Sequence, residues 1–168
     1  MKNRLHEDTK QFWIIREKIL KEQEKTHNIY IYILTTRMNY LSRKYHAVIP
    51  LQARFEEPPV FPHGLMGICI SKNAIIGKNC TIFQNVTIGS NNFQDSKGFG
   101  SPEIGDDVFI GANSVLIGNI KIGNGVRIGA GCSVFQSIPD NATVVCQPPR
   151  VILHESKRDN AFQGVKVK

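Results

Sequence analysis

An aliphatic side chain returns at every sixth position across residues 70–139, with one interruption. The series is Ile70, Ile76, Ile82, Ile88, Ile104, Ile110, Leu116, Ile122, Ile128 and Val134. A second series lies four residues after nine of these positions: Ala74, Cys80, Val86, Val108, Ser114, Ile120, Val126, Cys132 and Ile138. A period of six matches neither an α-helix nor a single strand. It predicts a chain that runs straight, turns a corner and repeats.

Three such sides make a triangular coil of eighteen residues, whose aliphatic side chains point inward. No coil can bury its apolar face alone, so the coils are expected to stack and pair as parallel strands. Glycine follows the aliphatic residue in six repeats, where we expect the backbone to turn or to approach a neighbour closely. These positions are Gly77, Gly89, Gly105, Gly111, Gly123 and Gly129. The repeats therefore predict a parallel β-helix.

These repeats resemble the hexapeptide-repeat acyltransferases, and most of all the branch of serine acetyltransferases and capsular polysaccharide O-acetyltransferases. The resemblance covers residues 46–153. The stretches that carry it are Pro62-His63-Gly64, Gly67-Ile68-Cys69-Ile70, Gln84 to Gly89, Pro102-Glu103-Ile104-Gly105, Ile117-Gly118-Asn119-Ile120 and Ile128-Gly129-Ala130-Gly131. It implies a mainly β fold, a left-handed parallel β-helix. The left hand comes from the resemblance alone, because the usual crossover rule favours the right hand.

Acetyl transfer from a thioester to a hydroxyl needs a base, and histidine suits that role near neutral pH. Of the five histidines, only His63 lies in a stretch that resembles the family's catalytic histidine. We therefore expect His63 to be the general base. Gln84 and Asn85 are expected contacts to the acyl group or the acceptor, although ordinary polar corner residues remain an alternative.

Two Gly-Ala pairs lie eighteen residues apart, or one coil, and should stack on the same face: Gly111-Ala112 and Gly129-Ala130. Small residues there leave backbone amides within reach of an extended amide-bearing arm. In the resembled family, matching positions line the groove for coenzyme A. Arg150 resembles the arginine of the family's closing motif and could meet the nucleotide phosphates. That motif is imperfect here, because Cys146 and Pro149 replace the expected glycine and alanine.

Three departures from the serine acetyltransferases concern the acceptor. Pro62 replaces an aspartate before the catalytic histidine, and Gly100-Ser101 replaces an Arg-His pair. No acid is found near Val48, where the family's base-orienting aspartate would lie, and placing Glu56 or Glu57 in that role is guesswork. These losses favour a sugar hydroxyl over L-serine, with Ser101 as a substrate contact.

Between Ile88 and Ile104 the spacing is sixteen, which predicts an excursion loop at residues 90–102 with a typical loop composition. In the resembled family this loop helps to enclose the active site beside a neighbouring subunit. A plain surface loop is the alternative.

Residues 1–48 are predicted to be a helical segment, with an amphipathic helix at 8–24 capped by Asp8 or Thr9 and a second helix at 29–45. Residues 49–153 form the β-helix domain, and residues 154–168 form a basic tail. The formal net charge of +7 lies mainly in residues 1–50, which hold ten Lys/Arg against five Asp/Glu. Solvated helix faces that cap the coil explain this charge better than nucleic-acid binding.

The four cysteines show no spacing typical of zinc, so no metal site is expected, and Cys80 and Cys132 fall on inward positions as small buried side chains. No run reaches eighteen apolar residues and residues 1–10 lack the apolar core of a signal peptide. A cytoplasmic setting is expected, with peripheral membrane association left open.

The expected function is an acetyl-CoA-dependent O-acetyltransferase, acting on a sugar in capsule or exopolysaccharide biosynthesis. Acetyl-CoA is the expected acetyl donor, and a homotrimer is expected because the resembled family builds each site from two chains. The alternatives are a serine O-acetyltransferase of cysteine biosynthesis and a non-catalytic β-helix scaffold.

Overall fold

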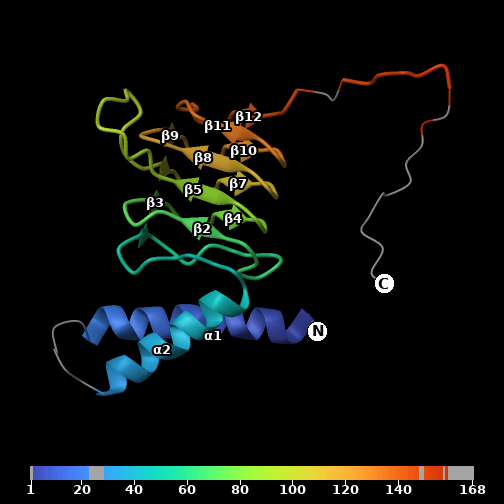
Figure 1. Ribbon diagram of the computed structural model, residues 1–168. Helices are drawn as coiled ribbons and strands as arrows, with labels where there is room; N and C mark the ends of the chain where they lie inside the picture. Colours follow the sequence, from blue (N-terminus) through green and yellow to red (C-terminus); the bar gives the residue numbers. More distant parts are fainter. Residues whose placement is uncertain (1, 23–28, 148–149, 157, 159–168) are drawn as a thin grey trace.

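The computed structural model describes residues 2–22, 29–147, 150–156 and 158, and it consists of two helices below a stack of short strands (Figure 1). The helices are α1 (Lys2–Glu22) and α2 (Ile29–Lys44). The second helix agrees with the predicted range, whereas the first begins earlier than predicted. No described helix has the length and apolarity that a membrane crossing requires.

Within the described residues, twelve strands of two or three residues form three parallel sheets, one on each side of a triangular coil. One sheet contains β1 (Arg54–Phe55), β3 (Ile75–Ile76), β6 (Glu103–Ile104) and β9 (Lys121–Ile122). A second contains β4 (Thr81–Ile82), β7 (Phe109–Ile110), β10 (Arg127–Ile128) and β12 (Thr143–Val144). The third contains β2 (Cys69–Ile70), β5 (Thr87–Gly89), β8 (Val115–Ile117) and β11 (Ser133–Val134). Consecutive strands along the chain lie in different sheets, as a parallel β-helix requires.

The strand registers confirm the predicted coil length. Phe109 pairs with Arg127 and Val115 with Ser133, so each partner lies eighteen residues further along the chain. All ten aliphatic residues of the main series are buried, with at most 3% of their surface exposed. They stack along the axis of the coil and form the continuous core that no single coil could provide. The small inward positions are filled as predicted, and Ser114 there donates a hydrogen bond to the Gly129 carbonyl (2.9 Å).

The corners depend on residues with a left-handed backbone conformation. Asn79, Asp107, Gly125 and Asn141 occupy one such position in successive coils, with φ between 50° and 65°. Asparagine, aspartate and glycine are the residues that adopt this conformation most readily.

None of the six glycines that follow the aliphatic residues has a positive φ. These glycines therefore do not supply the left-handed conformation at the corners. Their predicted role in close approach is confirmed in four repeats: a Cβ at Gly77, Gly105, Gly111 or Gly123 would lie within 2.6 Å of the next coil.

Residues 90–102 leave the coil as predicted, and they form a loop closed at its base. Asn91 and Gly100 exchange backbone hydrogen bonds of 2.8 and 3.0 Å. The registers across the loop lengthen to 28 residues, as between Ile75 and Glu103, which leaves ten residues outside the coil. The Asn119 amide donates to the Gly98 carbonyl (2.9 Å), so the loop is also attached to the coil above it.

Helix α1 closes the lower end of the coil (Figure 1). Its residues Phe12, Trp13, Ile15 and Ile19 are buried in the same core cluster as Ala53, Phe61 and Leu65. Arg16 lies buried among them and donates to the carbonyls of Leu51 and Ala53, which begin the first coil. Burial lowers the pKa of the Arg16 guanidinium. The buried arginine supplies hydrogen bonds to a coil edge that has no coil beneath it.

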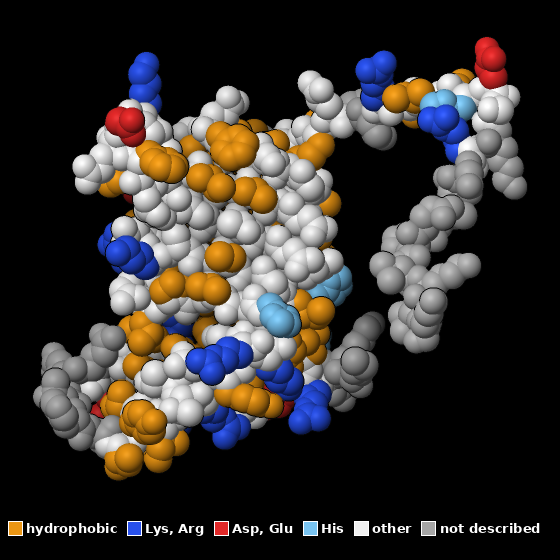
Figure 2. Space-filling model, in the orientation of Figure 1, with side chains coloured by type: hydrophobic (Ala, Val, Ile, Leu, Met, Phe, Trp, Pro, Cys, Tyr) orange, Lys and Arg blue, Asp and Glu red, His pale blue; other side chains and the backbone are white. Residues whose placement is uncertain are grey.

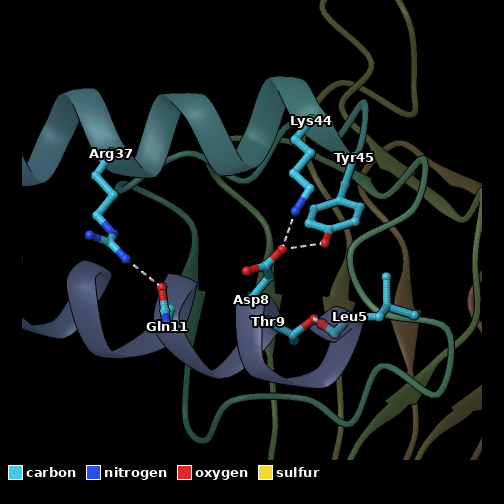
Figure 3. Close-up of polar contacts among 7 residues, drawn as sticks. All are labelled: Leu5, Asp8, Thr9, Gln11, Arg37, Lys44 and Tyr45. Atoms are coloured by element: carbon cyan, nitrogen blue, oxygen red, sulfur yellow. Dashed lines mark hydrogen bonds and ion pairs between the residues drawn. The ribbon is translucent and has the colours of Figure 1, made fainter. Parts of the chain in front are cut away.

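Asp8 joins α1 to the end of α2 and does not cap α1 (Figure 3). Its Oδ2 accepts hydrogen bonds from Lys44 Nζ and from the Tyr45 hydroxyl. Thr9 also lies inside the helix, where its hydroxyl donates to the Leu5 carbonyl (2.9 Å). The predicted capping roles are therefore wrong, because Leu5 packs against Gly64 of the coil and holds an additional turn of helix before Asp8.

The Asp8 contact makes the stability of the helical base depend on pH. Hydrogen bonds from Lys44 and then Tyr45 lower the pKa of the Asp8 carboxyl below its ordinary value. A lowered pKa stabilises the folded chain above the unfolded value, and this stabilisation is lost as the pH falls through the folded value. We expect Asp8→Asn to lower the Tm at pH 7 and to have little effect at pH values below the folded pKa. Thermal unfolding from pH 3 to 7 measures this.

Glu17→Gln is the matched control, because Glu17 forms only an exposed i,i+4 pair with Lys21 (3.7 Å). We expect this variant to follow the wild-type pH profile closely, since exposed pairs contribute little. If the Tm of Asp8→Asn differed from the wild-type Tm by the same amount at every pH, the role assigned to the Asp8 carboxylate would be contradicted.

Candidate active site

One corner of the coil stacks five dipeptides directly above one another, and we call this set the corner column. It consists of Tyr45-His46, Met66-Gly67, Gln84-Asn85, Ala112-Asn113 and Ala130-Gly131. In each step the second residue donates its N–H to the carbonyl of the first residue one coil below, at 2.8 to 3.1 Å. All five second residues have φ between 51° and 71°. The column is therefore a regular ridge of backbone that runs along one edge of the coil.

His63 lies at the lower end of this column, in the corner before β2. Its Nδ1 lies 2.6 Å from Oε1 of Gln84, one coil above. An amide oxygen can only accept, so this contact places the imidazole proton on Nδ1 and leaves the lone pair on Nε2. The His63 side chain is exposed to solvent, whereas its neighbour Gly64 is buried against Leu5 of α1. The ring is thus oriented by a fixed partner and accessible to a substrate.

Two phenylalanines form an apolar wall beside the histidine. Phe83 contacts the His63 ring edge to face, with centroids 5.5 Å apart, and Phe109 lies 5.2 Å from Phe83. Figure 2 shows histidine side chains low on the coil with hydrophobic side chains beside them. Phe83 was not among the predicted site residues. Its position directly before Gln84 could have indicated it, since the two residues share a corner.

The two Gly-Ala pairs stack in this column, as their spacing predicts. The Gly131 amide donates to the Ala112 carbonyl (2.8 Å), and the Gly111 amide donates to the Ile128 carbonyl (2.8 Å). Among the described residues, the amides of Ala112 and Ala130 donate no hydrogen bond. Ala130 is exposed and Ala112 half-buried, so both residues lie at the surface along the column.

The remaining predicted site residues occupy different places. Asn85 lies in the column, where its amide nitrogen donates to Asn113 Oδ1 (3.1 Å). Ser101 lies at the next corner of the coil and accepts from the Ser71 hydroxyl (3.2 Å). Arg150 is exposed beyond β12, in the segment that leaves the coil (Figure 1). One chain therefore brings together His63, Gln84, Asn85 and the Gly-Ala pairs, but it does not bring Ser101 or Arg150 to them.

Within the described ranges, no group of three or more His, Cys, Asp or Glu side chains could hold a metal ion. Cys80 is buried at its inward position, where its thiol donates to the Gly105 carbonyl (3.3 Å). Burial raises the pKa of this thiol, as expected for a structural cysteine. Cys132 is also buried but contacts a second cysteine.

Residues 101–136 match a family model described as bacterial transferase hexapeptide (six repeats). The chain is a hexapeptide-repeat protein. It is 38% identical over 127 residues to a serine acetyltransferase of Synechococcus elongatus, which covers 75% of this chain and 51% of the relative. It is also 38% identical over 128 residues to a serine acetyltransferase of Staphylococcus epidermidis, which covers 76% of this chain and 59% of the relative.

Solved structures give the same result for the fold. This hexapeptide-repeat protein is similar to serine acetyltransferase isoform 3 of Entamoeba histolytica in complex with cysteine, with a TM-score of 0.67 and 28% identity. That match covers 86% of this chain and 50% of the other. The serine acetyltransferase of Brucella abortus in complex with coenzyme A gives a TM-score of 0.63 and 28% identity, with 82% and 53% covered.

These matches and the parallel sheets confirm the predicted fold, a left-handed parallel β-helix with an N-terminal helical segment. They also confirm the resemblance to the serine acetyltransferase branch. The hexapeptide-repeat protein spans between half and three fifths of the length of these two curated relatives.

Proposed function

We propose that this protein is an acetyl-CoA-dependent O-acetyltransferase with His63 as its general base. The observation that carries the proposal is the His63–Gln84 pair, which lies at one end of a column that continues into the free amides of Ala112 and Ala130. A base and a slot for a thioester arm are the two parts that acetyl transfer needs. The similarity to a serine acetyltransferase solved with coenzyme A supports the same assignment.

In this mechanism Nε2 of His63 takes the proton of the acceptor's hydroxyl group. At the same time the hydroxyl oxygen attacks the carbonyl carbon of the acetyl group. A carbon–oxygen bond forms, the tetrahedral intermediate collapses, and the carbon–sulfur bond breaks. The imidazolium then returns the proton to the sulfur, which releases the thiol of coenzyme A. Gln84 holds the imidazole in the tautomer that this sequence requires, so we propose it as a positioning residue in addition to its predicted role as a substrate contact.

For coenzyme A, Ala112 and Ala130 would hold the pantetheine arm through their backbone amides. Gly111 allows the two coils to approach closely enough to present those amides on one ridge, because a Cβ at this position would lie 2.5 Å from the Ala130 nitrogen. Arg150 would meet the nucleotide phosphates, as the resembled family implies, if the segment after β12 folds back toward the column.

We also propose a homotrimer, in which Ser101 and the excursion loop of one subunit approach the corner column of the next. Two observations support this assembly. Ser101 lies at a different corner from His63 within one chain, and apolar side chains beside the column are exposed, with Val60 at 55%, Met66 at 48% and Phe109 at 40%. A subunit contact would cover them and complete the substrate site.

The acceptor is the open part of the proposal. The curated relatives reported above are named serine acetyltransferases, which favours L-serine and gives no support to the sugar predicted from the sequence. The prediction of a sugar acceptor rests on Pro62, Gly100 and Ser101. In the resembled family, the groups that they replace would bind an amino acid. L-Serine is therefore the first acceptor to test, with sugars beside it.

Thiol release from acetyl-CoA tests the proposal, with L-serine and a panel of sugars as acceptors and direct measurement of coenzyme A binding. Release that depends on L-serine identifies a serine acetyltransferase, and release that depends on a sugar supports the three substitutions as specificity determinants. An absence of both release and coenzyme A binding would favour the scaffold and overturn the proposal.

Gln84 provides a specific prediction for the positioning role. Gln84→Ala removes the hydrogen bond at Nδ1 of His63, and we expect turnover to fall roughly 10- to 100-fold, as for other groups that orient a functional histidine. Gln84→Glu keeps an acceptor at the same place and should lose less. Equal losses in both variants would contradict a role through Nδ1 of His63.

A further inference from the structure

Cys132 and Cys146 lie with their sulfur atoms 2.7 Å apart, at the upper end of the coil. A disulfide bond measures about 2.0 Å, so the two atoms need to move only about 0.7 Å to reach bonding distance. Both residues are free cysteines in the structure. Cys132 is buried with 3% of its surface exposed, whereas Cys146 is exposed.

The backbone holds the two residues in this relation. β12 pairs with β10 in parallel, and the Gly129 amide donates to the Val144 carbonyl (2.9 Å). The Cys146 thiol, two residues beyond β12, lies 3.5 Å from the Ala130 carbonyl. The Cys132 thiol lies 3.8 Å from the Val144 carbonyl. Cys146 therefore lies beside the corner that precedes Cys132, and Cys132 lies beside the strand that precedes Cys146. Their proximity does not depend on flexible side chains alone.

We propose that Cys132 and Cys146 are a redox-active thiol pair, which a small-molecule disulfide such as oxidised glutathione converts to an intramolecular disulfide. The exposed Cys146 is the thiol that meets the oxidant. Its thiolate attacks one sulfur of the small-molecule disulfide and displaces one thiol, which leaves a mixed disulfide at Cys146. Cys132 then gives up its proton and attacks the Cys146 sulfur, which releases the second small thiol. Two protein thiols are oxidised, and one disulfide is reduced to two thiols.

The order of these steps follows from the environments of the two thiols. Burial, followed by the contact with Cys146, raises the pKa of Cys132 to about 11, so it is a poor first nucleophile. As the resolving thiol it needs no access to solvent, because its target lies against it. Cys80 provides the contrast, since within the described residues its buried thiol contacts the backbone carbonyls of Lys78 and Gly105 and no second sulfur.

The bond would fasten the chain after β12 to the corner beside Ala130. In this way oxidation would fix the start of the segment that carries Arg150, next to the proposed coenzyme A column. The thiol chemistry itself does not depend on acetyl transfer, so it can be tested whether or not the chain is an acetyltransferase.

The test is to incubate the full chain with oxidised glutathione, block the remaining thiols with an alkylating agent, and map the linked peptides by mass spectrometry. We expect the wild-type chain to lose two of its four free thiols, with a single link between residues 132 and 146. Cys69→Ser is the matched control at an exposed cysteine and should give the same link. Cys146→Ser should lose the internal link.

Cys132→Ala separates the two steps, because it leaves the exposed thiol without its resolving partner. We expect this variant to accumulate the mixed disulfide at Cys146. The proposal is overturned if the wild-type chain retains four thiols under conditions that oxidise a model dithiol, or if the link joins other cysteines or two chains.

Discussion

Replacing His63 with alanine is expected to lower the rate of acetyl transfer by roughly 100- to 10,000-fold, the usual contribution of a general base. Coenzyme A affinity and the Tm should change little, because the His63 side chain is exposed and its partners are the side chains of Gln84 and Phe83. Thiol release from acetyl-CoA measures the rate, with the acceptor that supports release by the wild-type chain.

His6→Ala is the matched control, since His6 is an exposed histidine on α1. It should retain wild-type turnover. A His63→Ala variant within a few-fold of wild type would remove His63 from the mechanism. A variant that lost turnover together with its Tm would show a structural role, and His63→Asn, which retains a polar side chain, would then distinguish the two effects.

Gly111→Ala, next to the column, is expected to destabilise the fold strongly, because the added methyl group would meet the backbone of the next coil. A Cβ at Gly111 would lie 2.5 Å from the Ala130 amide nitrogen and 2.9 Å from both the Ala130 Cα and the Gly129 carbonyl carbon. These are backbone atoms of the next coil, so the clash can be relieved only by separating the coils. We expect a loss of about 2 to 3 kcal/mol and a fall in Tm of roughly 5 to 10 °C.

Gly89→Ala is the matched control, because Gly89 also follows a buried isoleucine in its repeat. There the nearest atoms to a new Cβ are side-chain carbons, with Ile117 Cγ1 at 3.4 Å. We expect this change to leave the Tm within a few degrees of wild type, as measured by thermal unfolding of both variants. Equal Tm values for the two variants would show that the coils can separate without cost. Weaker coenzyme A binding by a folded Gly111→Ala chain would further support the column as the binding site.

The acceptor is where the residues and the relatives point in different directions. The relatives are named for serine, whereas Pro62, Gly100 and Ser101 lack the groups that would bind an amino acid. The structure adds that Ser101 and His63 lie at different corners of one chain. A site completed by a second subunit would set the acceptor through residues that no single chain brings together.

The coil could be predicted from the sequence because its period is a local property. An aliphatic residue every sixth position, with a small residue four later, can be buried only if the chain turns at regular intervals, and every residue of the main series is buried. The break between Ile88 and Ile104 located the excursion loop for the same reason. The stacking of the two Gly-Ala pairs also followed, because eighteen residues return the chain to the same corner.

Contacts between coils were decided only by the tertiary structure. Gln84 is predicted to contact the substrate, and the structure adds a partner that the sequence did not indicate: its amide oxygen lies on His63, because a corner extended by residues 62–67 brings the histidine below it. Asp8 was expected to cap a helix, but the contact of Leu5 with Gly64 lengthens α1 and leaves Asp8 facing Lys44 and Tyr45. In both cases the partner is distant in the sequence, so no local pattern could indicate it.

The cysteine pair shows the limit of the period itself. Cys132 lies on an inward position of the repeat, but Cys146 lies fourteen residues later, which is not a multiple of six. The two meet because the last coil is shorter: Arg127 pairs with Thr143, sixteen residues further along the chain, whereas Phe109 in the coil before it pairs with Arg127 at a distance of eighteen. The six-residue repeat determined which side chains are buried. The changes in coil length, which only the folded backbone reveals, determined that the two cysteine thiols lie together.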